Sequence, residues 1–211
     1  MQWSGIVAYC VGLITTDGCL SSDRRHINFT SKDLELVEHV RAGFGTHNRI
    51  GRKSRAAGAV KRYYCVQLGS ITLYRWLCEV GLTPRKSLTL GPLKVPDHYF
   101  ADFLRGHLDG DGNICTYIDP VFSHSVRLYV RFHCASRPHL DWLQTTARRL
   151  WSLTGYQTNT GRVFRLSYAK RESTTLLRYL YYSSSVPCLS RKRRSAEDFL
   201  HDAEVAELAD A

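Results

Sequence analysis

One short stretch of sequence occurs twice, and this repeat constrains the fold more than any other feature. The first copy is Cys10–Gly18 and the second is Leu104–Gly112. Each belongs to a helix-length apolar run, contains a central glycine and closes on Asp-Gly. The closing aspartates, Asp17 and Asp111, lie nearly half the chain length apart. A repeat at this spacing predicts a chain built from two copies of one structural unit.

Each copy predicts the end of a helix. We expect helices over Trp3–Thr16 and Tyr99–Gly110, ended by Gly18 and Gly112 as caps in the left-handed region. A carboxylate at this point faces the negative end of the helix dipole, where lysine or arginine is preferred. Because the same unfavourable placement occurs twice, it indicates a functional site. A bound hard divalent cation, such as Mg²⁺, would relieve the repulsion.

The central glycines predict how the two helices meet. Gly12 and Gly106 carry no Cβ, so the helices can pack backbone to backbone, as small residues permit in tight helix pairs. The carboxylates of Asp17 and Asp111 would then meet at one end of the pair. Two acidic groups around hard metal ions are typical of phosphodiester hydrolysis.

The motif also has two simpler interpretations. A single Asp-Gly after a helix is usually only a turn, but two copies at equivalent points make that reading less favoured. The second copy also resembles the middle of an EF-hand loop. In that register the first and last ligand positions fall on His107 and Ile118, where Asp and Glu are required, so an EF-hand is excluded.

The paired motif resembles the LAGLIDADG homing endonucleases (meganucleases) of the single-chain, two-motif, monomeric type. Gly12–Gly18 and Leu104–Gly112 keep the family's central glycine and final Asp-Gly, and the following segments correspond over nearly the whole chain. The resemblance implies an α+β fold in which two pseudo-symmetric α-β-β-α-β-β-α halves form a saddle-shaped antiparallel sheet surface, with the motif helices packed at the centre. It also implies divalent-metal-dependent cleavage of double-stranded DNA with staggered 3′ overhangs, and intron or intein mobility.

The resemblance assigns a metal site. Asp17 and Asp111 would hold Mg²⁺ or Mn²⁺, joined by the backbone carbonyls of Thr16 and Gly110. Ca²⁺ is expected to bind without supporting cleavage. A single molecule would cut both strands of a long, asymmetric target. The same fold leaves two alternatives open, an RNA maturase for introns and a DNA-binding regulator without cleavage activity.

Further catalytic positions also follow from the resemblance. A family lysine lies after the third helix of each half, near the metals, and Lys86 and Lys192 match it. A phosphate clamp is the alternative for the basic run Arg191–Arg194. At a supporting polar position after the second strand this chain has Ser31 and Ser136, which are shorter than the amides often found there.

Charge and strand patterning favour nucleic acid as the partner. The net charge is +10, which predicts an anionic partner, with a merely soluble basic protein as the alternative. In the clearest strand, Arg127–Cys134, one face is apolar, and the other carries Arg, Tyr and His without any acidic residue. Such a face suits base readout and phosphate contacts. The side chains predicted to contact DNA are His26, Asn28, Thr30, Lys53, Arg55, Lys61, Tyr63, Gln67, Arg127, Tyr129, Arg131, His133 and Arg165.

The order of elements predicts the domains. We expect a first half over residues 1–82, a proline-rich linker over 83–98, a second half over 99–195 and an acidic, frayed tail over 196–211. The other predicted elements are the strand His26–Thr30, the helix Lys32–Phe44 capped by Ser31, the hairpin Arg49–Gly69, the helix Ile71–Val80 ending at Gly81, the helix Pro138–Leu153, the hairpin Tyr156–Tyr168 with Arg165 and Ser167 exposed, and the helix Arg171–Tyr182.

The remaining features bear on location. Seven cysteines without a C-x-x-C pair predict reduced thiols, as in cytosolic proteins. No apolar run reaches the length of a membrane span, and the N-terminus resembles neither a signal nor a transit peptide. We therefore expect a cytoplasmic or nucleoid-associated protein, organellar if its host gene is organellar, that is neither secreted nor membrane-bound.

Overall fold

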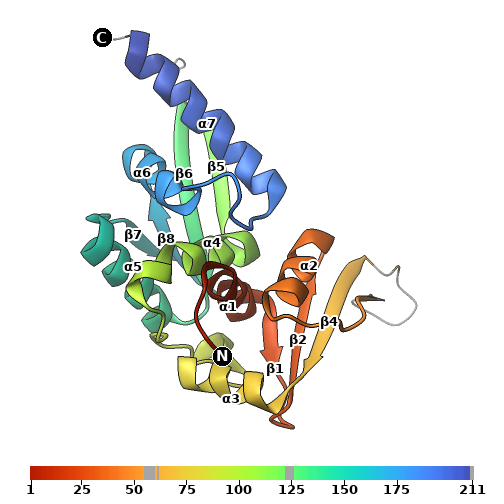
Figure 1. Ribbon diagram of the computed structural model, residues 1–211. Coiled ribbons are helices and arrows are strands. Elements are labelled where there is room, and N and C mark those ends of the chain that lie inside the picture. Colours follow the sequence, from red (N-terminus) through yellow and green to blue (C-terminus); the bar gives the residue numbers. More distant parts are fainter. Residues whose placement is uncertain (55–59, 61, 122–125, 210–211) are drawn as a thin grey trace.

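The computed structural model describes residues 1–54, 60, 62–121 and 126–209, and it consists of one unit repeated twice (Figure 1). The first half contains α1 (Gly5–Asp17), β1 (Gly18–Leu20), β2 (His26–Ser31), α2 (Leu34–Gly43), β3 (Gly51–Lys53), β4 (Tyr63–Gly69) and α3 (Ile71–Val80). The second contains α4 (Phe100–Asp111), β5 (Asn113–Ile118), β6 (Val126–Cys134), α5 (Arg137–Trp151), β7 (Tyr156–Asn159), β8 (Phe164–Tyr168) and α6 (Lys170–Leu180). Two short 3₁₀ turns, Lys86–Leu88 and Asp97–Tyr99, lie between the halves, and α7 (Ser190–Ala209) follows. The predicted α+β plan is confirmed.

Each half has a four-stranded antiparallel sheet, in the order β1-β2-β4-β3 and β5-β6-β8-β7. The alternation of β2 has the predicted effect, because Ile27 and Phe29 are fully buried whereas Asn28 is partly exposed. One face of each sheet therefore packs on helices and the other remains accessible. No helix in the described part of the chain is both long enough and apolar enough to cross a membrane.

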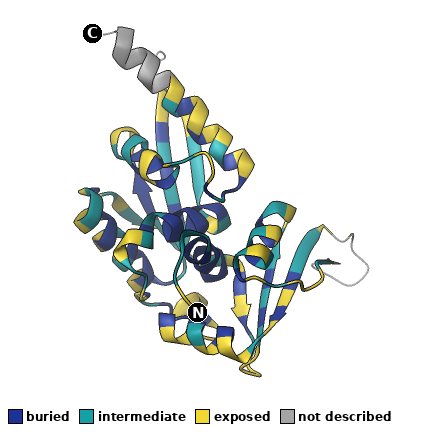
Figure 2. Cartoon of the chain, in the orientation of Figure 1, coloured by how far each residue is buried: buried dark blue, intermediate teal, exposed yellow. Residues whose placement is uncertain are grey.

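Helices α1 and α4 pack against each other between the two sheets (Figure 1). A Cβ atom at Gly12 would lie 2.2 Å from the carbonyl oxygen of Phe103, and one at Gly106 would lie 2.1 Å from that of Tyr9. Both neighbours are backbone atoms, so only glycine allows this approach. Figure 2 shows that the most buried residues gather at this helix pair.

The predicted left-handed caps are wrong. Gly18 and Gly112 have φ of −86° and −87°, in the extended region. The physical reason is that the chain leaves each helix directly into a strand, β1 or β5, without reversing. These positions still exclude side chains, because a Cβ at Gly18 would lie 2.6 Å from the Ile14 carbonyl oxygen.

Two other local predictions need correction. Helix α2 is capped at Asp33 and not at Ser31, because β2 continues through Ser31, which pairs with Tyr64. Ser167 is fully buried and not exposed. Its cross-strand partners on the same sheet face are the larger Arg131 and Tyr156, and a small side chain between two large ones is covered.

The C-terminal segment is a helix, so the prediction of a frayed tail is wrong for its described part. Helix α7 runs from Ser190 to Ala209, and Ala196 and Phe199 are buried in the core at helical spacing. Phe199 also lies under Lys170, whose amine is 5.8 Å from the ring centroid. An apolar stripe within an acidic sequence therefore docks the helix.

Candidate active site

Asp17 and Asp111 are the last residues of α1 and α4, and they lie at the same end of the helix pair. A Cβ at Gly110 would lie 3.2 Å from Asp17 Oδ2 and 1.9 Å from Thr16 Oγ1. The end of α1 thus touches α4 one residue before Asp111. Both aspartates reach the solvent. The two carboxylates that sequence analysis singled out therefore share one surface site.

The surroundings raise the pKa of both carboxylates. Loss of hydration raises the pKa of Asp17 to about 6, with a second contribution from the negative charge of Asp111; Lys192 and Lys86 act in the opposite direction. The same loss of hydration raises the pKa of Asp111 against the pull of Lys192, His133 and Lys86. Although both groups reach solvent, the surrounding protein removes enough water to disfavour two negative charges here. A cation at this point would reverse that penalty.

Lys86 and Lys192 are both buried beside this pair. Lys86 Nζ donates to the carbonyl of Gly18, and Lys192 Nζ donates to that of Gly112 at 2.7 Å. Burial lowers the pKa of Lys192 to about 8 and also lowers the pKa of Lys86. Two cavities flank the site. The Lys86 cavity, of about 240 Å³, includes Thr16, Asp111 and His133 in its lining, and the Lys192 cavity, of about 410 Å³, includes Gly110, Asp111 and Arg191.

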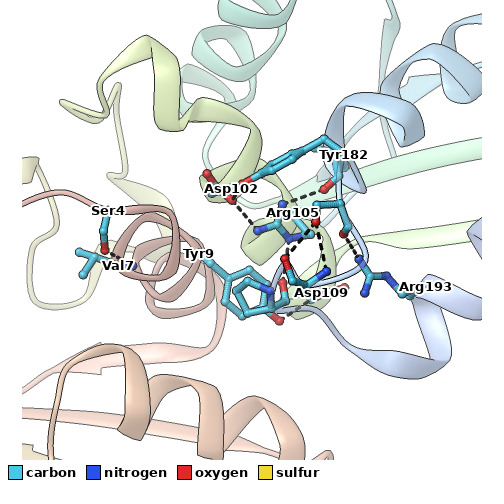
Figure 3. Close-up of polar contacts among 12 residues, drawn as sticks. Ser4, Val7, Tyr9, Asp102, Arg105, Asp109, Tyr182 and Arg193 are labelled. Carbon is cyan, nitrogen blue, oxygen red and sulfur yellow. Dashed lines mark hydrogen bonds and ion pairs between the residues drawn. The ribbon is translucent and has the colours of Figure 1, made fainter.

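A buried polar network fixes α4 against the segment that leads to α7 (Figure 3). The fully buried Arg105 donates to the carbonyls of Pro187 at 2.8 Å and Leu180 at 2.7 Å, and pairs with Asp102 at 2.5 Å. One turn further along α4, Asp109 Oδ2 accepts from Tyr9 Oη at 2.8 Å and from the amide of Leu189 at 2.7 Å. This network was not predicted from the sequence. The signal was present as charged residues inside an apolar motif helix.

The donor atoms at the site fit a divalent metal that is shared with a substrate. Within the described ranges, no group of three or more His, Cys, Asp or Glu side chains could hold a metal ion by itself. Mg²⁺ does not need such a cage, because it is usually held by one or two carboxylates together with waters and substrate phosphates. Asp17 and Asp111 supply two carboxylates, and Thr16 and Gly110 lie in contact between them.

On the first sheet, two of the predicted DNA-contacting residues, Asn28 and Gln67, form an amide pair. Gln67 Nε2 donates to Asn28 Oδ1 at 3.1 Å, and Asn28 Nδ2 donates to Ser21 Oγ at 3.0 Å. Lys53 Nζ lies 3.5 Å from Thr30 Oγ1 on the same face. His26 is bound by Asp23 in the preceding turn, and Tyr63 is partly exposed beside Lys32. Arg55 and Lys61 lie outside the described residues.

On the second sheet, the corresponding face is aromatic and cationic. Tyr117 and Tyr129 stack with ring centroids 5.9 Å apart, and the Arg131 guanidinium lies 4.8 Å from the Tyr129 ring centre. Arg131 Nη1 donates to the sulfur of Cys115 at 3.5 Å. Its buried Nε has no hydrogen-bond partner among the residues described. Tyr117 was not among the residues predicted to contact DNA. Its position opposite Arg127 on the neighbouring strand is the feature that would have indicated it.

Three other predicted contact residues already have protein partners. Arg127 forms an ion pair with the buried Asp119, so it is held at the end of the sheet. His133 Nδ1 donates to the carbonyl of Asp111 at 3.1 Å, which places His133 at the carboxylate site. Arg165 Nε donates to Thr158 Oγ1 at 3.2 Å.

Comparison with known proteins agrees with this geometry. Residues 5–81 match the LAGLIDADG-like domain family. The homing endonuclease I-WcaI bound to its DNA recognition sequence superposes with a TM-score of 0.67 at 10% identity, over 93% of this chain and 88% of that one. The chain has the LAGLIDADG fold. I-DmoI in complex with DNA and Ca gives 0.57 at 15% identity, over 85% of this chain and 91% of that one. No curated protein matches the sequence.

The LAGLIDADG fold also occurs outside the homing endonucleases. Full-length DUF199/WhiA from Thermatoga maritima superposes with a TM-score of 0.60 at 12% identity, over 96% of this chain. The chain spans 63% of that protein's length. At such identities the likeness shows the fold, so the chemistry must be argued from the site itself.

The two serines predicted at a supporting polar position, Ser31 and Ser136, have different surroundings in the two halves. Ser31 and Cys134 each end a second strand and accept a hydrogen bond from the amide two residues on, of Asp33 at 3.2 Å and of Ser136 at 3.4 Å. Cys134 is therefore the structural equivalent of Ser31. Ser136 instead caps α5, is buried and donates to the carbonyl of Leu90. Ser136 thus lies two residues beyond the equivalent of Ser31, and the supporting role of both serines stays a prediction.

Proposed function

We propose that the protein is a sequence-specific, divalent-metal-dependent endonuclease that makes a staggered cut in double-stranded DNA, leaving 3′ overhangs. The observation that carries this proposal is the convergence of Asp17 and Asp111 at one end of the α1–α4 pair. Loss of hydration raises the pKa of both carboxylates, and the charge of Asp111 adds to the effect on Asp17, so two negative charges are unfavourable here unless a cation joins them. A fold that needed the helix pair only for packing would gain nothing by keeping them.

The chain's own residues would hold and orient the reacting groups. Asp17 and Asp111, with the carbonyls of Thr16 and Gly110, would hold Mg²⁺ or Mn²⁺. When bound, such a metal activates a water for in-line attack and stabilises the leaving oxygen. The backbone contact between α1 and α4 fixes the spacing of the carboxylates, because neither helix can move without breaking it. One solved structure of I-DmoI is in complex with DNA and Ca, and another is in complex with its target DNA in the presence of Mn.

The sheet faces support DNA as the partner and an asymmetric target. An amide pair, Asn28 with Gln67, suits adenine, whereas an arginine such as Arg131 suits the O6 and N7 atoms of guanine. The two halves therefore present different donors and acceptors to the two half-sites. With both motifs on one chain, a monomer suffices for both cuts.

A cleavage-inactive DNA-binding regulator is the second candidate function. The likeness to DUF199/WhiA favours it, because that protein carries a LAGLIDADG domain and its name mentions no nuclease. The paired aspartates favour the nuclease, since a protein that only binds DNA has no use for carboxylates that repel the phosphate backbone. A maturase acting on intron RNA is supported by no specific contact.

Cleavage of a randomised duplex library tests the proposal. The wild-type protein should cut a small set of sequences in Mg²⁺ or Mn²⁺, and none in Ca²⁺ or with chelator. The recovered sites should be non-palindromic, and sedimentation should show one protein per duplex. Enrichment of bound duplexes without any cut in Mg²⁺ or Mn²⁺ would favour the regulator instead.

A further inference from the structure

The two buried lysines occupy equivalent places but make different hydrogen bonds. Lys86 donates to the carbonyl of Gly18 and Lys192 to that of Gly112, the glycines that directly follow the two aspartates. Lys192 also donates to two carbonyls in the last turn of α4, those of Leu108 at 2.5 Å and Asp109 at 2.9 Å.

The two lysines differ in how many N–H donors they have left for another acceptor. A lysine ammonium has three N–H donors and no acceptor. Lys192 uses all three on backbone carbonyls. Lys86 makes one hydrogen bond, to Gly18, within the part of the chain that the structure describes, so two of its three donors remain for another acceptor. Lys86 lines the cavity that also contains Asp111, so these donors are available to a group bound there.

The chain around each lysine reinforces this difference. Leu189, three residues before Lys192, donates its amide to Asp109 on the turn that Lys192 caps. Asp109 is in turn held by Tyr9 from α1 (Figure 3). Lys86 instead opens a single 3₁₀ turn after Arg85, which has a φ of +57°.

We infer that the two lysines have divided roles. Lys192 is a positioning residue that caps α4 and holds Asp111 in place, whereas Lys86 is the catalytic lysine that donates to a non-bridging oxygen of the scissile phosphate. The inference rests on the proposed nuclease function for Lys86 only. Lys192 cannot reach a phosphate without releasing one of its three backbone carbonyls, and Lys86 can do so without breaking a bond.

Hydrogen exchange tests the positioning role without DNA or metal. In K192M, the amide of Gly112, which bonds the Leu108 carbonyl, should exchange at least about tenfold faster, because the last turn of α4 loses its cap. The matched amide is that of Gly18, which bonds Ile14, and K86M should leave its exchange within about threefold of wild type. K192R should restore protection at Gly112. Unchanged exchange at Gly112 in K192M would overturn the role given to Lys192.

Cleavage of a duplex selected from the library tests the other role. K86M should lose about 100-fold or more in single-turnover rate, as expected when one transition-state donor is removed. K192M, assayed well below its own melting temperature, should lose about tenfold or less. Equal losses in the two variants would contradict the division. If K192M does not fold, K192Q keeps two of the donors and gives the same comparison. Should wild type cut no duplex, the nuclease proposal fails, and the exchange result still decides the role of Lys192.

Discussion

A single methyl group at the centre of the α1–α4 pair should destabilise the protein. In G12A the new Cβ would lie 2.2 Å from the carbonyl oxygen of Phe103 and 2.7 Å from the amide nitrogen of His107. Ordinary contact needs more than 3.4 Å, so the two helices must separate by about 1 Å at this point. Overpacking of this kind costs about 1–3 kcal/mol of unfolding free energy.

The expected loss of stability in G12A is opposite in sign to the effect of helix propensity alone. Alanine is favoured over glycine inside a helix by about 1 kcal/mol, so without the contact G12A would stabilise the protein. For a chain of this length, about 1–3 kcal/mol lowers the melting temperature by roughly 2–12 °C. Thermal unfolding measures the shift, and G91A is a control because nothing lies within 4 Å of its Cβ. A melting temperature equal to or above wild type in G12A would refute the reasoning. Separation of the carboxylates should also slow cleavage, since a misplacement of about 1 Å can cost about 100-fold.

Three further predictions follow from buried or exposed polar groups. Burial lowers the pKa of His139 to about 4 and that of its stacked neighbour His107 well below its usual value, while unfolded histidine titrates near 6.5. Between about pH 6.5 and 4 the unfolded state binds more protons than the folded state, so the urea midpoint should fall as the pH falls. In H139F the midpoint should depend less steeply on pH. An unchanged pH dependence in H139F would contradict the low pKa of His139. R105M should lower the unfolding free energy by about 3–5 kcal/mol, because it leaves the buried carboxylate of Asp102 without its ion-pair partner. R149M removes an exposed ion pair with Asp97 and should cost about 1 kcal/mol or less. Urea titration measures both changes. In library selection, R131Q should lose the guanine preference of one half-site and keep the other half-site unchanged; loss at both would mean that Arg131 supports the fold.

The motif predicted the centre of the fold from local sequence alone. A glycine inside an apolar helical run has a strong physical meaning, and Gly12 and Gly106 mark the two backbones that touch. The same holds for Ile27 and Phe29, whose alternation with polar residues predicts which face of the sheet is buried. Helix α3 even ends at the predicted Gly81, which has the left-handed φ of +118°.

Features that depend on contacts between distant segments could not be predicted in this way. The exposure of Ser167 depends on two neighbouring strands, and the docking of α7 depends on a surface for Phe199 that only the folded core provides. The bonds that distinguish Lys86 from Lys192 are of the same kind, because they join residues 68 to 84 positions apart. The equivalence of Cys134 with Ser31 needs the strand ends, which sequence places only approximately.

The central claim is that Asp17 and Asp111 form one metal-dependent cleavage site. Single-turnover cleavage and equilibrium binding of a selected duplex, measured side by side for D17N and D111N, test it most directly. D97N is the matched control, because Asp97 lies in an exposed ion pair with Arg149 away from the site. We predict that both site variants bind the duplex at least as tightly as wild type, since each removes a negative charge, and that neither cuts both strands in Mg²⁺. Double-strand cleavage at the wild-type rate in either D17N or D111N would contradict the claim.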